Sequence, residues 1–362
     1  MNSAAPKIKV SAETLRANDR VQLTRSGRFL IAELLTPHRV LSTSTRNGGQ
    51  RDDLRFLVNH QSLEGSGHIA RERHIIGLGL AAYHDSACSE IALDPTQVAL
   101  MGTAANMNYA AIEEARFDDV HVLTAVTAGV QGNAACAGDP ALWHESERGW
   151  EKVPYAGTIN TIAIVNVPLT EGALARAAMT ITEAKSAALA QLGVRSLYSY
   201  DLATGTGTDQ YCLAAPLTDA KPRTDTGPHS KLGEVLGSAV RAATVEALRW
   251  QNGMEPSYTR GIFHALGRYG IPETRFFEDM AAHLTGDQLE LLKRNNKSLF
   301  YEPYVAAAAY ALAAILDRVR HGTLPPKWPK KLCANRPPCS PRTSPHNPIA
   351  GPNSAPSSAP SK

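Results

Sequence analysis

The sequence contains no continuous run of about 18 apolar residues, so no membrane-spanning helix and no membrane partner are expected. Its N-terminal segment also lacks the apolar core of a secretory signal peptide, which predicts a cytoplasmic protein. The five cysteines include no C-x-x-C pair and their number is odd, so neither a zinc ribbon nor a disulfide framework is indicated. Reduced thiols agree with the cytoplasmic assignment.

Several functional motifs are missing as well. The phosphate loop G-x-x-x-x-G-K-[ST] does not occur, which weakens a nucleotide-binding interpretation. Histidines and carboxylates do not recur at the spacing of a metal site, so no metal and no other cofactor is predicted. The net charge of +3 comes from the tail Pro326–Lys362, which carries six Lys or Arg residues and no acid; without them the body is near −3. A mildly acidic body argues against nucleic acid as a partner.

The 362 residues, of which 43% are hydrophobic, are enough for a sizeable core. We expect a main domain over 19–252 and a helical extension over 253–325. The Ala-rich part of the extension packs against the main domain or against a second subunit, so a homo-oligomer stays open. The remaining residues, 326–362, form a basic tail rich in Pro and Ser, which cannot bury enough apolar surface to become ordered.

Alternation of apolar and polar residues over 20–58 is typical of strands. The later elements are expected as strands over 98–101, 120–127, 158–167 and 206–216 and helices over 106–116, 171–192 and 228–250. Their order, strand-helix-strand-strand-helix-strand, is ferredoxin-like. The sequence therefore predicts an α+β protein in which helices pack on a mainly antiparallel or mixed sheet that the early strands extend.

The most unusual stretch is 202–234. Glycine and threonine alternate from Thr204 to Thr208, and Asp209 and Gln210 follow. Glycine lets backbone N–H groups approach a ligand, and threonine hydroxyls can donate or accept hydrogen bonds. We interpret this stretch as part of a site, although a Gly/Thr-rich turn without function has the same composition.

The second half of the stretch has the residues typical of a helix N-terminus. Pro228 suits the first helical position, and Gly227 or Thr226 suits the cap. His229 and the two residues after it then crowd the positive end of the helix dipole, where free N–H groups favour an oxyanion. The simpler interpretation is a well-capped surface helix.

The helix over 171–192 carries a lysine within its apolar stripe. The stripe follows a spacing of four and three residues through Leu174, Ala178, Ile181, Lys185, Ala188 and Leu192. Lys185 is therefore either buried and paired, in which case it can act in catalysis or bind an anionic group, or it extends its stem to the surface. Glu183 lies on roughly the opposite face, so the two are not a pair within the helix.

Two polar residues stand beside the early strands. Arg46 follows a run of hydroxyl residues and precedes an Asn47-Gly48 turn. A hairpin turn accounts for Asn47 but not for Arg46. His60 follows a strand, where a lone histidine is more often structural than functional.

Taken together and in order, the blocks of residues 20–250 resemble the adenosylcobinamide amidohydrolase family (CbiZ type). The blocks that carry the resemblance are Asn47-Gly48-Gly49, Gly102-Thr103-Ala104-Ala105-Asn106, Thr127-Ala128-Gly129-Val130, Gly132-Asn133-Ala134, Gly138-Asp139, Gly157-Thr158-Ile159-Asn160-Thr161-Ile162, Thr182-Glu183-Ala184-Lys185, Ala203-Thr204-Gly205-Thr206-Gly207-Thr208-Asp209-Gln210 and Gly227-Pro228-His229-Ser230-Lys231-Leu232-Gly233-Glu234.

The resemblance implies a hydrolase whose partner is a small-molecule corrinoid. Such enzymes cleave the amide that joins the aminopropanol arm to the corrin ring of adenosylcobinamide, and the product, adenosylcobyric acid, re-enters cobalamin assembly. Relatives also resemble corrinoid-remodelling enzymes, which implies a complete adenosylated cobamide as a second substrate. The alternative is a corrinoid-binding or delivery protein that does no chemistry.

Amide hydrolysis needs a nucleophile, donors for the oxyanion and an acid for the leaving amine. The expected catalytic residues are His229, Asp209, Lys185 and Lys231. The nucleophile stays open between water and a hydroxyl such as that of Thr208 or Ser230. The expected substrate-binding residues are Arg46, Asn47, His60, Asn106, Asn133, Asn160, Glu183, Thr206, Thr208, Gln210, Asp225, Ser230 and Glu234.

These assignments require the regions near 185, 209 and 229 to meet in one cavity. A metal-assisted route would in addition need His60, His229 and Asp209 to converge. One further histidine, His121, follows Asp119 in a near match to the D-x-H-x-x-G motif of cobalt-binding domains, but Thr124 replaces the glycine and the segment is predicted as a strand. We interpret His121 as a strand residue.

Overall fold

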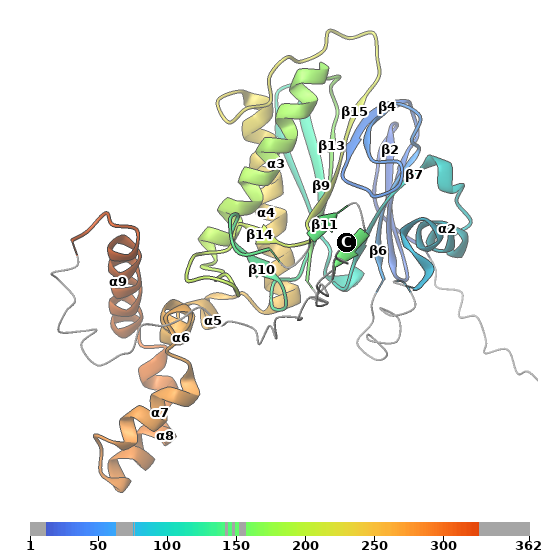
Figure 1. Ribbon diagram of the computed structural model, residues 1–362. Coiled ribbons are helices and arrows are strands. Elements are labelled where there is room, and N and C mark those ends of the chain that lie inside the picture. The colour runs from blue at the N-terminus through green and yellow to red at the C-terminus, as the bar shows by residue number, and fades with distance from the viewer. Residues whose placement is uncertain are drawn as a thin grey trace, which may run out of the picture.

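The computed structural model shows two β-sheets packed face to face, with helices on both outer faces (Figure 1). The layers are, in order, α2 (Leu80–Glu90), a five-stranded sheet, a six-stranded sheet, and the pair α3 (Glu171–Gln191) and α4 (Lys231–Asn252). The structure describes residues 12–62, 75, 77–141, 144–146, 149–151 and 157–325. The predicted α+β class with mixed sheets and C-terminal helices is confirmed, whereas the predicted tail over 326–362 lies outside the described residues.

The five-stranded sheet combines four early strands with one later strand. Its spatial order is β1 (Glu13–Ala17), β2 (Val21–Ser26), β3 (Phe29–Leu34), β6 (Phe56–Gln61) and β7 (Val98–Thr103). The first four strands are antiparallel to their neighbours, and β6 and β7 run parallel. The short 3₁₀ turn η1 (Pro95–Gln97) leads into β7.

The six-stranded sheet holds the elements of the candidate site. Its spatial order is β5 (Gly49–Arg51), β4 (His38–Ser42), β15 (Gln210–Pro216), β13 (Ile159–Val165), β9 (Val120–Ala128) and β8 (Ala111–Phe117). The central strands β13 and β15 run parallel, and the other neighbours are antiparallel. Two short pairs lie outside the two sheets, namely β10 (Ala134–Ala135) with β14 (Gly205–Thr206) and β11 (His144–Ser146) with β12 (Gly149–Glu151).

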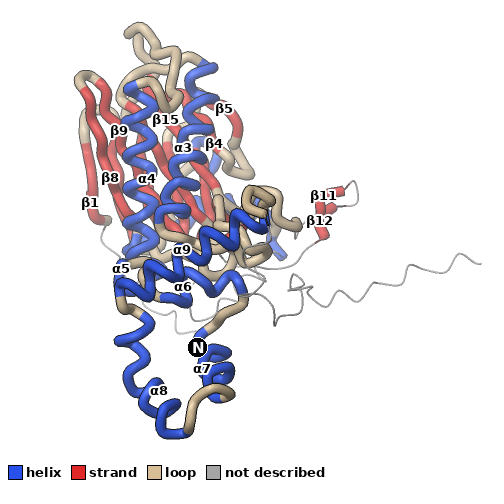
Figure 2. The backbone as a smooth tube through the Cα atoms, turned by 90° about the vertical axis from the view of Figure 1, so that its left-hand side faces the viewer, coloured by secondary structure: helices blue, strands red, loops and turns tan. Residues whose placement is uncertain are grey.

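Strand β13 shows why the sequence folds into these layers. All seven of its residues are buried, because one face meets the five-stranded sheet and the other meets α3 and α4. Ile162 and Ile164 belong to the core between the sheets, and Ala163 and Val165 belong to the core under the two helices. Figure 2 shows α3 and α4 side by side over this sheet. A strand that is buried on both faces reads as a nearly continuous apolar run.

The ferredoxin-like order predicted from the sequence is wrong for two reasons. The segment predicted as a helix over 106–116 is the short turn η2 (Met107–Tyr109) followed by β8, which forms a hairpin with β9. In addition, β7 belongs to the five-stranded sheet and not to the sheet of β9, β13 and β15. Of the early strands, β4 and β5 extend the six-stranded sheet, as expected, but β2, β3 and β6 build the second sheet.

The N-terminus of α4 is also shifted from its predicted position. Ser230 is the N-cap, since its Oγ accepts a hydrogen bond from the Gly233 amide at 3.1 Å, and the helix begins at Lys231. Pro228 therefore lies before the helix and not in its first turn. A serine side chain satisfies a free N–H group directly, which the expected caps Gly227 and Thr226 do less well.

The extension is helical, as predicted. It contains α5 (Pro256–Thr259), α6 (Ile262–Leu266), the 3₁₀ turn η3 (Gly267–Tyr269), α7 (Glu273–Ala281), α8 (Gly286–Phe300) and α9 (Pro303–Arg320). Helices α6 and α9 lie under the C-terminal end of α3, and α7 and α8 project away from the sheets (Figures 1 and 2). Within the described residues no single helix passes the length and hydropathy test for a membrane span, although α8 and α9, bent by 77°, pass it as a pair.

Three histidines in different layers should make stability depend on pH. Burial lowers the pKa of His38 on β4, His84 on α2 and His264 on α6, in each case against a smaller opposing effect of a backbone carbonyl. The unfolded chain therefore binds more protons than the native state just below pH 6.5. The contribution of the neutral histidines to stability is fully present well above pH 6.5. It should fall as the pH drops toward the lower native pKa values, by about 1.4 kcal/mol per histidine for each pH unit between its unfolded and native pKa values. Urea unfolding at pH 7.5, 6.5 and 5.5 measures this, and equal unfolding free energies at all three would contradict it.

Candidate active site

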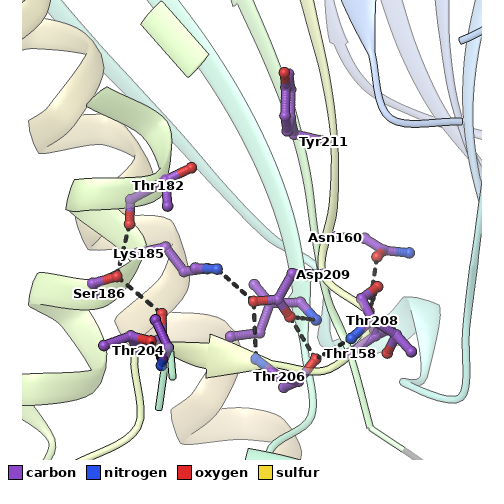
Figure 3. Close-up of polar contacts among 12 residues, drawn as sticks. Thr158, Asn160, Thr182, Lys185, Ser186, Thr204, Thr206, Thr208, Asp209 and Tyr211 are labelled. Atoms are coloured by element: carbon purple, nitrogen blue, oxygen red, sulfur yellow. Dashed lines mark hydrogen bonds and ion pairs between the residues drawn. The ribbon is translucent and has the colours of Figure 1, made fainter. Parts of the chain in front are cut away.

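An ion pair between α3 and the Gly/Thr stretch is at the centre of the candidate site. Lys185 Nζ lies 2.5 Å from Asp209 Oδ2, and the side chains are 14% and 15% exposed (Figure 3). Lys185 is therefore buried and paired, the first of the two arrangements that the helix pattern left open. Gly205 is required beside it, because a Cβ there would lie 2.3 Å from Asp209 Oδ2 and 2.6 Å from Lys185 Nζ.

Asp209 also organises the residues around it. Its Oδ1 accepts hydrogen bonds from the Thr206 hydroxyl at 2.6 Å and from the Ile159 amide at 2.9 Å. Its Oδ2 accepts one from the Thr206 amide at 3.0 Å, in addition to the contact with Lys185. One carboxylate thus connects α3, β13 and the turn before β15. The hydroxyl of Thr206, the carboxylate and the ammonium group form a continuous chain of contacts.

A cavity of about 650 Å³ opens beside this chain. Its lining comes from four segments: residues between Asn133 and Ala141, a stretch that includes β10, residues between Thr182 and Ser186 on α3, Tyr198, and Thr204 to Thr208. The cavity also contains Cys136, and burial, followed by the nearby Asp139 carboxylate, raises the pKa of its thiol. Cys136 therefore stays a neutral thiol at neutral pH.

A second cavity, of about 420 Å³, lies on the other side of the same turn. Thr208, Asp209 and Gln210 line it, together with Arg46 and with Tyr83 of α2. Arg46 is not free there, since its guanidinium pairs with Asp85 of α2. Gln210 accepts a hydrogen bond from the Gly102 amide at 3.2 Å. The turn is thus accessible from both sides.

The expected meeting of residues near 185, 209 and 229 is wrong for His229. His229 is exposed and lies just before α4. The segment before α4 contacts the first part of α3, through Thr226 and Ala173, away from Lys185. Its neighbour Asp225 pairs with Arg176, which precedes Lys185 by nine residues, or roughly 14 Å along a helix. Because β15 and α3 both span the sheet, their two ends cannot share a cavity.

The other expected residues of that block lie at the same far end. Lys231 pairs with Glu234 on the surface of α4, and its Nζ lies 4.6 Å from the centre of the Phe117 ring. Ser230 is the helix cap described above. The glycines have a packing role, since a Cβ at Gly233 would lie 2.0 Å from the Gly227 carbonyl oxygen. This block is explained by the close contact of α4 with the turn before it.

Two expected binding residues are buried and line neither cavity: Asn160 lies between the two sheets, and His60 lies between the five-stranded sheet and α2. Asn160 is fully buried, and its Nδ2 donates to Asn59 Oδ1 at 2.9 Å and to the Gly102 carbonyl at 3.0 Å. His60 is fully buried as well; it stacks on Phe29, and its Nδ1 lies 2.8 Å from the Tyr83 hydroxyl. Convergence of His60, His229 and Asp209 on a metal is not observed, and the described residues contain no cluster of three or more metal-ligating side chains.

Of the asparagines in three other blocks, two stabilise loops and one lines the large cavity. Asn47 donates to the carbonyls of Pro95 and Val98, and the Asn106 side chain caps its own turn, so both stabilise loops. Asn133 instead lines the large cavity, where its Oδ1 accepts a hydrogen bond from the Tyr198 hydroxyl at 3.1 Å. Glu183 is exposed on α3, away from the ion pair. His121 lies on β9 with its Nε2 2.8 Å from Glu114, which confirms that it is a strand residue.

The sequence interpretation missed several lining residues. Thr182 lies one turn before Lys185, and Ser186 lies one turn after Thr182, so helical spacing along this face was a usable signal. Ser186 Oγ donates to the Thr204 carbonyl and thereby ties α3 to the Gly/Thr stretch (Figure 3). Tyr198 belongs to an irregular segment that carries no periodic pattern, and only the fold places it here.

Residues 13–256 match the sequence model of a family described as adenosylcobinamide amidohydrolase. The matched region contains both sheets, α3, α4 and the three residues Thr206, Asp209 and Lys185. The chain belongs to the adenosylcobinamide amidohydrolase family. It is therefore an amidohydrolase of corrinoid salvage, as the resemblance of its blocks implied. The match ends within α5, so nearly all of the helical extension lies outside the adenosylcobinamide amidohydrolase region.

Individual relatives give less information about the function than the family does. The chain is 36% identical to the uncharacterised protein MJ1613 of Methanocaldococcus jannaschii over 176 residues, which are 46% of this chain and 68% of that protein. Among solved structures, it is similar to the PH0078 protein of Pyrococcus horikoshii with a TM-score of 0.31, at 15% identity, over 66% of this chain and 83% of that one. The L-aminopeptidase D-Ala-esterase/amidase of Ochrobactrum anthropi gives 0.28 at 12% identity, over 66% and 82%. Both scores are too low to align individual residues of the amidohydrolase.

Proposed function

We propose that the corrinoid amide is hydrolysed in the large cavity by Thr206, Asp209 and Lys185. The observation that carries the proposal is the chain of contacts from the Thr206 hydroxyl through Asp209, at 2.6 Å, to Lys185, at 2.5 Å. A nucleophile within hydrogen-bond reach of a base, which a third group orients, is the arrangement expected of covalent catalysis. All of it borders a cavity of about 650 Å³, within the usual range for small-molecule sites.

In the proposed first step the Thr206 oxygen attacks the amide carbon while its proton passes to Asp209. Lys185 places a positive charge where the oxyanion of the tetrahedral intermediate develops, which lowers the barrier electrostatically. Collapse of the intermediate breaks the carbon–nitrogen bond, and the leaving amine takes the proton from Asp209. Water then hydrolyses the ester on Thr206, which releases adenosylcobyric acid and regenerates the hydroxyl.

The substrate in this proposal is adenosylcobinamide or a complete adenosylated cobamide. The cavity takes the amide arm and one edge of the corrin ring, and Tyr198, Asn133 and Lys185 all line it. A corrinoid carrier without chemistry, the alternative that the sequence left open, would need the same cavity but not the hydroxyl of Thr206. Turnover by the purified protein separates the two.

Replacement of Thr206 tests the proposed nucleophile. Thr206→Val should reduce kcat by at least about 10³-fold, because the attacking oxygen is removed, whereas Thr206→Ser keeps a hydroxyl and should retain most of the activity. The measurement is the release of adenosylcobyric acid from adenosylcobinamide, with thermal unfolding to confirm that both variants fold. If Thr206→Val turns over as well as Thr206→Ser, the hydroxyl only holds the turn and a water molecule is the nucleophile.

A further inference from the structure

The C-terminal helices contact one irregular segment of the main domain at several points, which include three polar contacts from α6, η3 and α9. His264 of α6 has its Nε2 2.7 Å from the Leu192 carbonyl oxygen. Arg268 of η3 donates to the Tyr200 carbonyl at 2.6 Å. Arg320 at the end of α9 pairs with Asp201. All three contacts fall within residues 192–202, which link α3 to the Gly/Thr stretch.

Arg268 is the most deeply buried of these contacts. Its side chain is 7% exposed, and its two terminal nitrogens lie 2.6 and 2.5 Å from the two carboxylate oxygens of Asp317 on α9. Burial by itself would raise the pKa of Asp317, but the hydrogen bonds from Arg268 and Tyr269 outweigh it and lower that pKa. A buried bidentate pair of this kind fixes the guanidinium in one orientation. Arg268 therefore holds the Tyr200 carbonyl rigidly.

The far side of the same segment forms a wall of the proposed substrate cavity. Ser196 Oγ donates to Asp139 Oδ2 at 2.6 Å, and the Tyr198 hydroxyl donates to Asn133 Oδ1 at 3.1 Å. Asp139, Tyr198 and Asn133 all line the cavity. Only Ser199 separates Tyr200, whose carbonyl Arg268 contacts, from Tyr198, which lines the cavity.

We infer that Arg268 is a positioning residue through which the C-terminal helices hold the Tyr198 wall of the cavity and so determine affinity for the corrinoid. This inference rests on the proposed location of the site in the large cavity. It gives a function to helices that lie outside the region shared with the family model. Arg268 itself touches no reacting atom, so its effect is on binding and not on the chemical step.

Arg268→Gln in the full-length protein tests the inference. The substitution removes the bidentate pair and weakens the contact with Tyr200, so KM for adenosylcobinamide should rise about tenfold while kcat changes less than about threefold. The dissociation constant of the product, adenosylcobyric acid, measured by equilibrium dialysis, should rise by the same factor. The matched control is Arg294→Gln on α8, an exposed arginine that is outside this contact region, which should leave both quantities unchanged.

Hydrogen exchange of residues 195–203 shows whether the segment itself responds. Faster exchange there in Arg268→Gln, together with the weaker binding, supports the inference. Unchanged KM and product affinity overturn it, whether or not exchange is faster, because the segment would then not determine binding. Arg268→Lys keeps the positive charge but not the bidentate geometry of the guanidinium group, so it should recover only part of the affinity for the product. The Thr206 variants test the location of the chemistry separately, and product binding does not depend on which group attacks.

Discussion

Asp209→Asn is expected to reduce kcat by about 10³-fold or more, a loss comparable with that of Thr206→Val. The carboxylate is the proposed proton acceptor for Thr206, and it also neutralises Lys185 at 2.5 Å. An amide has nearly the same shape, but it cannot take the proton and offers one acceptor oxygen in place of two. The measurement is single-turnover conversion of adenosylcobinamide, with thermal unfolding to verify the fold.

The control for Asp209 is a paired carboxylate at the other end of the sheet. Asp119 pairs with Arg223 and is more than half exposed, so Asp119→Asn should keep kcat within about twofold, because exposed pairs contribute little. His229→Ala should behave in the same way, since His229 is far from the cavity. A loss of activity in His229→Ala comparable with that of Asp209→Asn would place the chemistry at the start of α4 and overturn the proposed site.

Gly233→Ala should lower the free energy of unfolding by about 3 kcal/mol, the largest stability effect that we expect from a single methyl group. The added Cβ would lie 2.0 Å from the Gly227 carbonyl oxygen and 2.4 Å from that of Thr226, and neither backbone group can move freely. Thr226 is fully buried and held by hydrogen bonds to Ala173 and from Thr180. Relief of the clash must therefore push α4 away from α3.

Gly237→Ala is the matched control on the same helix. A Cβ there would meet the Thr180 methyl group at 3.6 Å, which is an ordinary contact. Alanine favours a helix interior over glycine by about 1 kcal/mol, so this variant should be slightly more stable than the native protein. Urea denaturation of both variants gives the comparison. Equal unfolding free energies for the two alanine variants would show that the start of α4 is not packed as described.

The sequence predicted those parts of the fold whose pattern is local. The stripe from Leu174 to Leu192 placed α3 within one residue of its observed C-terminus and turned Lys185 toward the core, where it meets Asp209. The alternation of apolar and polar residues in β2, β3 and β4 likewise indicated strands. The helix predicted over 106–116 was wrong because alanine and glutamate in that segment favour a helix, while the hairpin partner β9 enforces a strand. Tertiary pairing outweighs propensity in such cases.

Long-range geometry could not be predicted in the same way. His229 follows Asp209 by only twenty residues, and both sit in the richest motif of the chain, so a shared site was a natural hypothesis. The intervening strand β15 runs across the whole sheet before α4 begins, and it separates the two residues by the length of the domain. Proximity in sequence is therefore misleading when the connecting element is fully extended. Tyr198 and Arg268 show the converse, because only the fold brings them near the cavity.

The buried amide contact between Asn59 and Asn160 has a mechanical consequence for the sandwich. Asn59 belongs to the five-stranded sheet and also donates to Thr127 of the six-stranded sheet, so three polar side chains connect the two sheets within a largely apolar core. Apolar faces alone would permit one sheet to slide over the other by small steps. Any such displacement would leave a buried side-chain amide without a hydrogen-bond partner, at a cost of about 1–3 kcal/mol for each group. The two sheets therefore cannot slide over each other freely, and the turn that contains Asp209 keeps a fixed position relative to both sheets.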